Sequence, residues 1–457
     1  MSHWAAAELS HIDLGDIRRN RRLVQIVEDL ASQPSVSVPQ ASRDAAALQG
    51  MYDFWKSRRV DANQIVKAHA QSTVSRMNEV QVVLAIQDTT EFNFTSHKKM
   101  AGLGHLDHGK CRGLKCHSVL AVTDTGTPLG LLHQKIWARD IDKIGQKHQR
   151  HLRSTSEKES QRWLDHLKAT QATIPEGIRW VMVADREADI YDLFAEAEQL
   201  NSHFLVRATQ DRQVKSTDPD VEDTAKLVAT MQRLPPAGTS ELFLCRHPKR
   251  EARQAKLSIR FQTLDIQPPM TRAKKEDLKP IRLQVILAQE ENPPEGENAV
   301  CCLLLTTLEV DNLEAALRTL RWYSYRWLIE RYHFTLKSGC LIEELQLSTA
   351  DRLERALATY AIVAWRLLWI TYEARENPEQ SCDTFLEAHE WQSLYCTIHK
   401  TSNPPLEPPT IRDAVRWIAQ LGGFIGRKAD GEPGVKTIWR GLRRLNDIAT
   451  TWKMLRT

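Results

Sequence analysis

The sequence has no long hydrophobic run and few cysteines. Its most apolar stretch, residues 361–370, contains Arg366, whereas a membrane-spanning helix needs about 20 apolar residues in succession. The first ten residues, MSHWAAAELS, lack the charged and apolar regions of a secretion signal. Eight cysteines scattered over 457 residues favour a reducing compartment over a disulfide framework. We therefore expect a cytoplasmic protein of two or three domains.

Excess charge of one sign is also absent, because the formal net charge is only +4 with 26% charged residues. Binding to a polyanion therefore has to come from local patches. Residues 1–78 are predicted to be helical, with helices starting near Asp13–Asp16, over 42–52 and over 62–77. The first of these contains a basic cluster that is either a solvated helix end or a set of phosphate contacts: Arg18, Arg19, Arg21 and Arg22.

Residues 322–337, WYSYRWLIERYHFTLK, are predicted to form one helix with two stripes on adjacent faces. The apolar stripe, which should pack against a core, contains Trp322, Tyr325, Ile329, Tyr332 and Leu336. The polar stripe contains Tyr323, Arg326, Glu330, His333 and Lys337. It places one carboxylate between an arginine and a lysine, although a solvated helix face with i,i+4 ion pairs would give the same spacing.

Two aspartates follow predicted strands. A strand is predicted over residues 80–86, with its end at Asp88 in AIQDTTEF. A second strand is predicted over residues 179–184, with its end at Asp185 in VADREADIYDLF. Further strands are expected over 117–122, 129–137 and 204–208, and a helix over 157–169. This order, followed by the Glu330 helix, is the plan of ribonuclease-H-like folds, whose three acids occupy the places of Asp88, Asp185 and Glu330. A strand-terminal aspartate can also be a helix cap.

Residues 209–300 alternate apolar and polar side chains between Pro-rich and charged turns, which predicts an antiparallel β-rich insertion. A long helix is expected over 352–373, and a helical, basic region follows the Pro-rich break at 401–409. The fold class is therefore α/β: a ribonuclease-H-like core interrupted by a β-rich insertion, with an all-α N-terminal domain and a mainly α C-terminal domain. The expected boundaries are 1–78, 79–375 (insertion about 209–300) and 376–457.

The spacing Tyr323-x2-Arg326-x3-Glu330-x6-Lys337 resembles the YREK signature of bacterial DDE transposases of the transposon-five (Tn5) group. The segments LGDIRRNRRLV and AAALQGMYDFW are similar to the N-terminal DNA-binding domain of that group. LGGFIGRKADGEP and TIWRGLRRL are similar to its C-terminal region. The resemblance covers the chain from Leu14 to Leu445.

The resemblance implies cut-and-paste transposition. The enzyme would bind the inverted repeats at the ends of its insertion sequence and nick one strand with water. The freed 3′-hydroxyl would then form a hairpin, which a second water opens before the 3′-hydroxyl attacks target DNA. Asp88, Asp185 and Glu330 would hold two Mg²⁺ ions about 3.5–4 Å apart, with Mn²⁺ as a substitute. A homodimer would hold two ends, on the nucleoid, and cut them in trans.

The resemblance also implies DNA contacts. Tyr323, Arg326 and Lys337 would bind end phosphates, and Arg207 in FLVRAT is a further candidate. Relatives carry a tryptophan before the Leu-Leu-Leu-Thr run, where it stacks on a flipped base, but this sequence has Cys302 there. We expect Trp327 to support the flipped base instead, with a packing role as the alternative.

Other readings remain open. A zinc site is conceivable in the loop that contains His105, His108, Cys111, Cys116 and His117, although the spacing fits no standard site. Helix caps and a solvated face account for Glu187, Asp189 and Asp192. The pair Glu343–Glu344 could rival Glu330 but has no Tyr, Arg and Lys set around it.

The chain could also be an inactive relative that occupies transposon ends as an inhibitor, or a stand-alone nuclease. The complete triad favours an enzyme, and the flanking domains argue against the nuclease.

Overall fold

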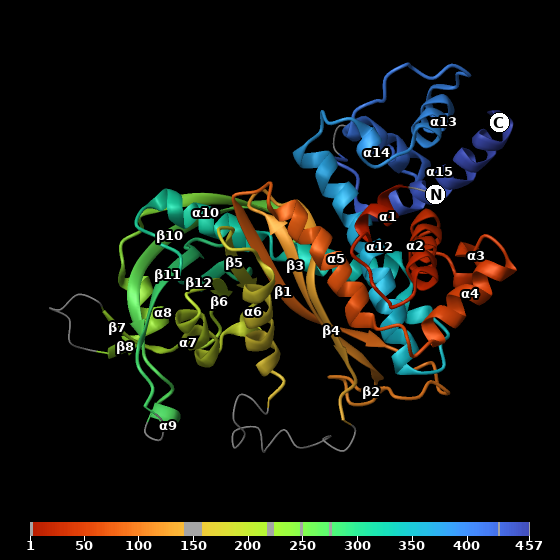
Figure 1. Ribbon diagram of the computed structural model, residues 1–457. Helices are drawn as coiled ribbons and strands as arrows, with labels where there is room; N and C mark the ends of the chain where they lie inside the picture. The colour runs from red at the N-terminus through yellow and green to blue at the C-terminus, as the bar shows by residue number, and fades with distance from the viewer. Residues whose placement is uncertain are drawn as a thin grey trace.

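A computed structural model describes residues 3–140, 158–216, 224–246, 250–273, 277–427 and 430–456. One mixed sheet runs through the body of the molecule in the order β2-β3-β1-β5-β6-β12-β11-β10-β7-β8, with β4 paired to β3 and β9 to β10 (Figure 1). Its first half consists of β1 (Val82–Asn93), β2 (Gly104–His105), β3 (Arg112–Thr123), β4 (Pro128–Trp137), β5 (Arg179–Ala184) and β6 (His203–Arg207).

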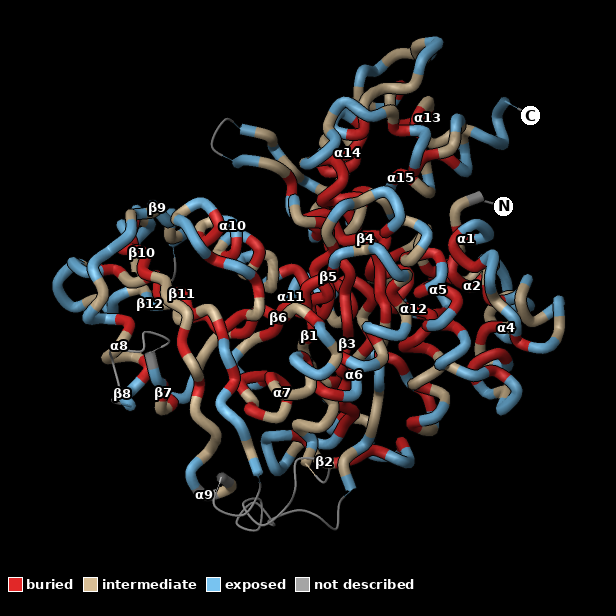
Figure 2. The backbone as a smooth tube through the Cα atoms, turned by 60° about the vertical axis from the view of Figure 1, so that its left-hand side comes forward, coloured by how far each residue is buried: buried red, intermediate tan, exposed pale blue. Residues whose placement is uncertain are grey.

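The two faces of the central strands pack against different helices, as their alternating side chains require. Leu84 and Ile86 of β1 lie in one core with α11 (Trp327–Phe334) and α12 (Ala350–Glu376). Val83 and Ala85 lie in a second core with α6 (Gln161–Thr173) and α7 (Tyr191–Gln199). The central strands are accordingly buried along most of their length (Figure 2).

Several predicted boundaries need correction. The first strand does not end at Asp88 but continues to Asn93, because β3 begins at Arg112 and supplies partners for residues 89–93. The strand over 179–184 and the helix over 62–77 are confirmed. The predicted start of the 157–169 helix lies outside the described residues, and α6 itself runs from Gln161 to Thr173.

The β-rich insertion is joined to the central sheet edge to edge. β12 (Cys301–Thr306) pairs with β6 on one side and with β11 (Ile281–Glu290) on the other. Four further strands extend the sheet outward: β7 (Gln213–Ser216), β8 (Thr224–Lys226), β9 (Gly238–Leu244) and β10 (Arg253–Ile266). The insertion also contains the short helices α8 (Leu227–Arg233) and α9 (Met270–Ala273). The antiparallel pairing predicted from the alternating pattern is confirmed.

The N-terminal helices are α1 (His3–Glu8), α2 (Ile17–Ser32), α3 (Val38–Ala41), α4 (Ala45–Lys56) and α5 (Ala62–Met77). Asp16, Asp44 and Asp61 each accept a backbone N–H bond at the start of α2, α4 or α5, which is the usual role of aspartate at such positions. α5 lies directly on β4, where a Cβ on Gly130 would come within 2.0 Å of Thr73 Oγ1.

The C-terminal helices α13 (Ala388–His399), α14 (Ile411–Leu421) and α15 (Val435–Arg456) form a third core with the end of α12. Figures 1 and 2 show both chain ends on the same side of the molecule, and Gln33, directly after α2, donates to Asp447 of α15 over 3.0 Å. No described helix is both long enough and apolar enough to cross a membrane.

A buried ionic cluster ties α1 to α5 and β4. Glu8 accepts from His69 Nδ1 over 2.6 Å and from Arg76 over 2.7 Å, while Leu131 N–H donates to His69 Nε2. Because Nε2 is an acceptor, the ring proton has to sit on Nδ1, facing Glu8. Burial raises the pKa of Glu8, but the His69 ring and the Arg76 guanidinium outweigh it and lower the pKa to about 2.

This cluster gives a prediction for acid stability. A carboxyl whose pKa falls from 4.5 to about 2 on folding contributes about 3 kcal/mol at neutral pH, and the contribution disappears as pH drops from about 4.5 to 2. Glu8→Gln should therefore lower the free energy of unfolding at pH 7, and the gap to wild type should close towards pH 2. Urea denaturation at several pH values measures this gap. A gap of constant size would show that the lost contact is not ionic.

Candidate active site

Asp88 lies on β1, and Asp185 directly follows the neighbouring parallel strand β5. The last registered pair of β1 and β5 is Ile86 with Val183, and each aspartate comes two residues after its member of this pair. Adjacent strands are about 4.8 Å apart, so both carboxylates occupy one edge of the sheet. Asp185 also caps the 3₁₀ turn η4 (Arg186–Ala188) through the N–H of Glu187, so the cap interpretation and the site interpretation both apply to it.

The predicted helix over 322–337 is not continuous. α10 (Leu313–Ser324) ends before Tyr325, α11 begins at Trp327, and a π-helical turn covers Thr335–Gly339. At the break the backbone hydrogen bonds change from the i,i+4 pattern of an α-helix to the i,i+3 pattern of a 3₁₀ turn, as in Leu328 N–H to Tyr325 O. No proline or glycine marks this break in the sequence.

The two predicted stripes nevertheless keep their character. Four of the five apolar positions are buried, and Tyr325 is half-buried. In the polar stripe Glu330 is exposed, Tyr323, Arg326 and Lys337 are half-buried, and His333 is buried. The stripe is therefore not a fully solvated face.

Glu330 forms an ion pair with Arg326 one turn earlier. Lys337, in the π-helical turn, lies 5.7 Å from the centre of the Phe92 ring on β1. Because Phe92 and Asp88 are on the same strand, this contact and the packing of α11 on β1 hold the signature segment over the strand that carries Asp88.

The pKa of Asp88 is raised to about 7. Burial is the main cause, and the charges of Asp185 and Glu330 add to it, while the Thr89 amide and Arg326 act in the opposite direction. Asp185 and Glu330 are thus near enough for their charges to disfavour ionisation of Asp88. Such hard oxygen donors suit a divalent cation, which would take the place of the proton. In the described part of the chain, however, no three acidic, His or Cys side chains converge closely enough to hold a metal ion.

Arg207, Tyr323 and Cys302 form a second group beside Asp185. Arg207 at the end of β6 donates to the Cys301 carbonyl over 2.8 Å. Burial raises the pKa of Tyr323, which also feels the charges of Arg326, Cys302, Arg207 and Asp185. Burial likewise raises the pKa of the Cys302 thiol to about 11, so Cys302 is a neutral side chain at this place.

Trp327 directly follows the helix break and is 38% exposed. Its ring meets Tyr372 of α12 edge-on at 5.9 Å, and the Arg331 guanidinium lies 5.2 Å from its centre. These contacts orient the indole without burying it.

The basic cluster on α2 divides into two kinds of side chain. Arg18, Arg21 and Arg22 are exposed, although Arg18 also pairs with Asp16. Arg19 is half-buried and donates to the Leu14 carbonyl, so it stabilises the start of the helix. The cluster is therefore more than a uniform solvated helix end.

The competing acids have structural partners. Asp189 is buried and paired with Arg212 at 2.6 Å, so the expectation of a solvated face is wrong for this residue. Glu187 pairs with Arg162 at 2.5 Å, and Asp192 pairs with Arg272 at 2.9 Å.

The two remaining alternatives lose support as well. Glu343 accepts the Asn93 N–H over 2.7 Å and so fixes a loop. Cys116 and His117 are consecutive on β3 and point to opposite faces, which prevents them from joining one zinc site. No such site exists among the described residues.

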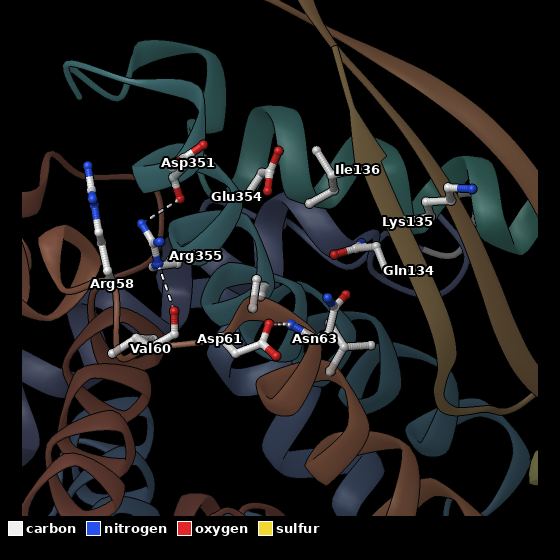
Figure 3. Close-up of a pocket in the computed structure, with 13 residues that line it drawn as sticks. Arg58, Val60, Asp61, Asn63, Gln134, Lys135, Ile136, Asp351, Glu354 and Arg355 are labelled. Atoms are coloured by element: carbon white, nitrogen blue, oxygen red, sulfur yellow. Dashed lines mark hydrogen bonds between the residues drawn. The ribbon is translucent and has the colours of Figure 1, made fainter. Parts of the chain in front are cut away.

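A cavity of about 620 Å³ lies at the junction of the N-terminal helices, β4 and α12, and none of the three carboxylates lines it (Figure 3). Arg355 crosses this junction and donates to the carbonyls of Val60 and Trp55. The sequence reasoning did not foresee this cavity, nor the contact of His333 with Asp88, whose Nδ1 and Oδ2 atoms are 3.8 Å apart. The presence of His333 in the polar stripe was the only signal for that contact.

The comparisons with known families cover almost the whole chain. Residues 1–60 match the family described as transposase DNA-binding, residues 83–366 match the transposase DDE domain, and residues 362–456 match the transposase Tn5 dimerisation domain. The middle match spans more than half of the chain and contains all three carboxylates as well as the mixed sheet. The protein therefore belongs to the DDE transposases of Tn5 type, with a ribonuclease-H-like core between DNA-binding and dimerisation regions.

Proposed function

We propose that this transposase cuts and joins DNA at Asp88, Asp185 and Glu330, in a cut-and-paste reaction on the ends of its own insertion sequence. The observation that carries the proposal is the placement of one aspartate on β1 and the other at the end of the adjacent strand β5, with the helix that bears Glu330 packed on β1. End binding is assigned to residues 1–78, chemistry to residues 79–375, and pairing of two protomers to residues 376–457.

Members of this family use divalent metal ions, and we propose Mg²⁺, as two ions, with Mn²⁺ as a substitute. When bound, such ions activate the attacking oxygen and offset charge on the phosphate. Asp88 and Asp185 would supply carboxylate oxygens from the sheet edge. Glu330 has to break its ion pair with Arg326 before it can become the third metal ligand. Glu330 is exposed but Arg326 is half-buried. A fully solvated i,i+4 ion pair contributes about 0.3–0.5 kcal/mol, which is a lower bound for the cost of this exchange.

Arg326 pairs with Glu330, and Lys337 lies against Phe92 on the strand of Asp88. Tyr323 feels the charges of Arg207 and Asp185. All four side chains, Arg326, Lys337, Tyr323 and Arg207, are proposed to bind phosphates near the cleavage point. A phosphate that binds Arg326 competes with Glu330 for the same guanidinium, because arginine donors match phosphate oxygens in paired geometry. Binding of the DNA end would thereby release Glu330 towards Asp88 and Asp185.

A direct assay tests the assignment. The inverted repeats that flank the gene supply the substrate, and a labelled duplex of that sequence should be nicked, then converted to a hairpin, when Mg²⁺ is added to the protein. Binding without any cleavage under these conditions would favour the inhibitor alternative.

The arginines on α2 are expected to contribute phosphate contacts in proportion to their exposure. Arg21→Ala and Arg22→Ala should each weaken end binding and reduce the slope of log K against log salt by about 0.9. Arg19→Ala should instead lower thermal stability, because it removes the bond to Leu14. Binding titrations at four salt concentrations give the slopes. Unchanged slopes would show that Arg21 and Arg22 make no phosphate contacts and belong to a solvated helix end.

Trp327 is proposed to support the base that flips during hairpin formation, since Cys302 has no ring for stacking. An aromatic partner returns about 1–3 kcal/mol per base. Trp327→Ala should therefore slow hairpin formation about 10-fold more than the first nick, and Trp327→Phe should keep most of the hairpin rate. Quench-flow analysis of the two products separates the steps. Equal slowing of both steps would leave Trp327 with a packing role against Tyr372.

A further inference from the structure

A row of polar side chains crosses three strands beneath α11. Asp88 of β1 lies opposite Ser118 of β3, and Ser118 lies opposite Gln134 of β4. All three side chains face α11, whose consecutive residues Tyr332 and His333 cover the row. Ser118 and Gln134 are buried, and Asp88 is at the open end of the row.

The hydrogen bonds along this row have a direction. Gln134 Nε2 donates to the Tyr332 hydroxyl over 2.9 Å and lies 3.5 Å from Ser118 Oγ, to which it also donates. The Ser118 hydroxyl also contacts Cys116 Sγ at 3.6 Å, but the stronger acceptor for its proton is His333 Nε2, 3.3 Å away. With Nε2 as the acceptor, the neutral ring carries its proton on Nδ1, and Nδ1 faces Asp88 Oδ2 at 3.8 Å.

Asp88 already has one fixed oxygen, because Oδ1 accepts the Thr89 N–H over 2.8 Å. Its Oδ2 can reach hydrogen-bond distance of His333 Nδ1 by moving about 1 Å. A carboxylate that is held at both oxygens presents its remaining lone pairs in one direction, and groups that orient metal ligands in this way change metal affinity by about 10–100-fold.

We infer that His333 is a positioning residue that donates from Nδ1 to Oδ2 of Asp88 and fixes the direction in which this carboxylate meets a divalent cation. The inference rests on the proposed function, because it assigns to Asp88 the role of a metal ligand. One helical turn of α11 then carries both a ligand, Glu330, and the group that orients another ligand across the sheet edge.

Two substitutions separate this role from packing, since each keeps one of the two ring nitrogens. The amide nitrogen of asparagine takes the place of Nδ1 as a donor, whereas the amide oxygen of glutamine takes the place of Nε2 as an acceptor. His333→Asn should therefore retain the bond to Asp88, and His333→Gln should retain only the bond to Ser118. The probe is Mn²⁺ alone, titrated into the full-length protein and followed by electron paramagnetic resonance, with thermal melting as a check on folding.

We expect Mn²⁺ affinity within about 3-fold of wild type for His333→Asn and a loss of about 10-fold or more for His333→Gln. His203→Gln, at the opposite end of β6 from Arg207, is the matched control and should bind Mn²⁺ as wild type does. Equal affinity in His333→Gln and wild type would overturn the inference, and so would equal losses in both His333 variants. Asp88→Asn should remove Mn²⁺ binding. If wild type binds no Mn²⁺, or if Asp88→Asn binds it equally well, the proposed metal site itself is wrong, and so is the role of His333.

Discussion

Glu330→Ala is expected to abolish metal-dependent cleavage of transposon-end DNA while leaving end binding largely intact. The same result is expected for Asp88→Ala and Asp185→Ala, because each removes one donor of the carboxylate set at the sheet edge. Loss of a single group that stabilises transition-state charge costs about 10²–10³-fold in rate, and a missing metal ligand should cost at least as much. Single-turnover cleavage and mobility shift of the same labelled duplex measure the two properties.

The control is a neighbouring carboxylate that has no place in the site. Glu344 is exposed on the turn η6 (Ile342–Glu344), so Glu344→Ala should cut at the wild-type rate. Glu343 is less suitable because it fixes the backbone at Asn93. A Glu330→Ala protein that cuts normally would move the site away from α11.

The second large effect concerns assembly. Deletion of residues from Asp413 onward is expected to leave complexes with a single DNA end and no cleavage, since paired protomers would cut each end in trans. The deletion also uncovers the signature segment, because Trp439 of α15 lies against Gly339 and 5.8 Å from Phe334. A loss of cleavage in the deletion alone would therefore have two explanations.

A point substitution removes this ambiguity. Leu455 near the end of α15 is 81% exposed and lies in the region that matches the dimerisation family. Leu455→Glu leaves Trp439 in place and should reduce two-end complexes, detected by native gels with duplexes of two lengths. Phe243→Glu on β9, also an exposed apolar position, should have no effect. A Leu455→Glu protein with normal two-end complexes would place the contact elsewhere on the C-terminal helices.

The sequence predicted those parts of the fold that local patterns encode. β5 and α5 have the expected bounds because an apolar run or a capped helical pattern defines each of them. The break between α10 and α11 could not be predicted, since Tyr325 and Arg326 are compatible with a helix. The change from i,i+4 to i,i+3 hydrogen bonds there has no signal in the local sequence. The continuation of β1 beyond Asp88 depends on its partner strand, which begins earlier than its apolar run suggests.

The candidate site shows the same division. Order along the chain and the signature spacing pointed to Asp88, Asp185 and Glu330, whose roles remain a proposal. The buried pair of Asp189 with Arg212 and the contact of His333 with Asp88 arise between elements far apart in sequence. Spacing within one segment carries no information about such contacts, so only the three-dimensional arrangement reveals them.

The pairing of β6 with β12 limits where the sequences of such enzymes can gain or lose residues. Because the insertion shares main-chain hydrogen bonds with the strand that follows Asp185, its inner strands cannot be lost without opening the edge of the sheet. The turn between β11 and β12, residues 291–300, is by contrast mostly exposed, and such a turn tolerates additions of sequence at little entropic cost. We expect lineages of this protein to vary in length at the far rim of the insertion and to keep a constant number of residues between β12 and α11.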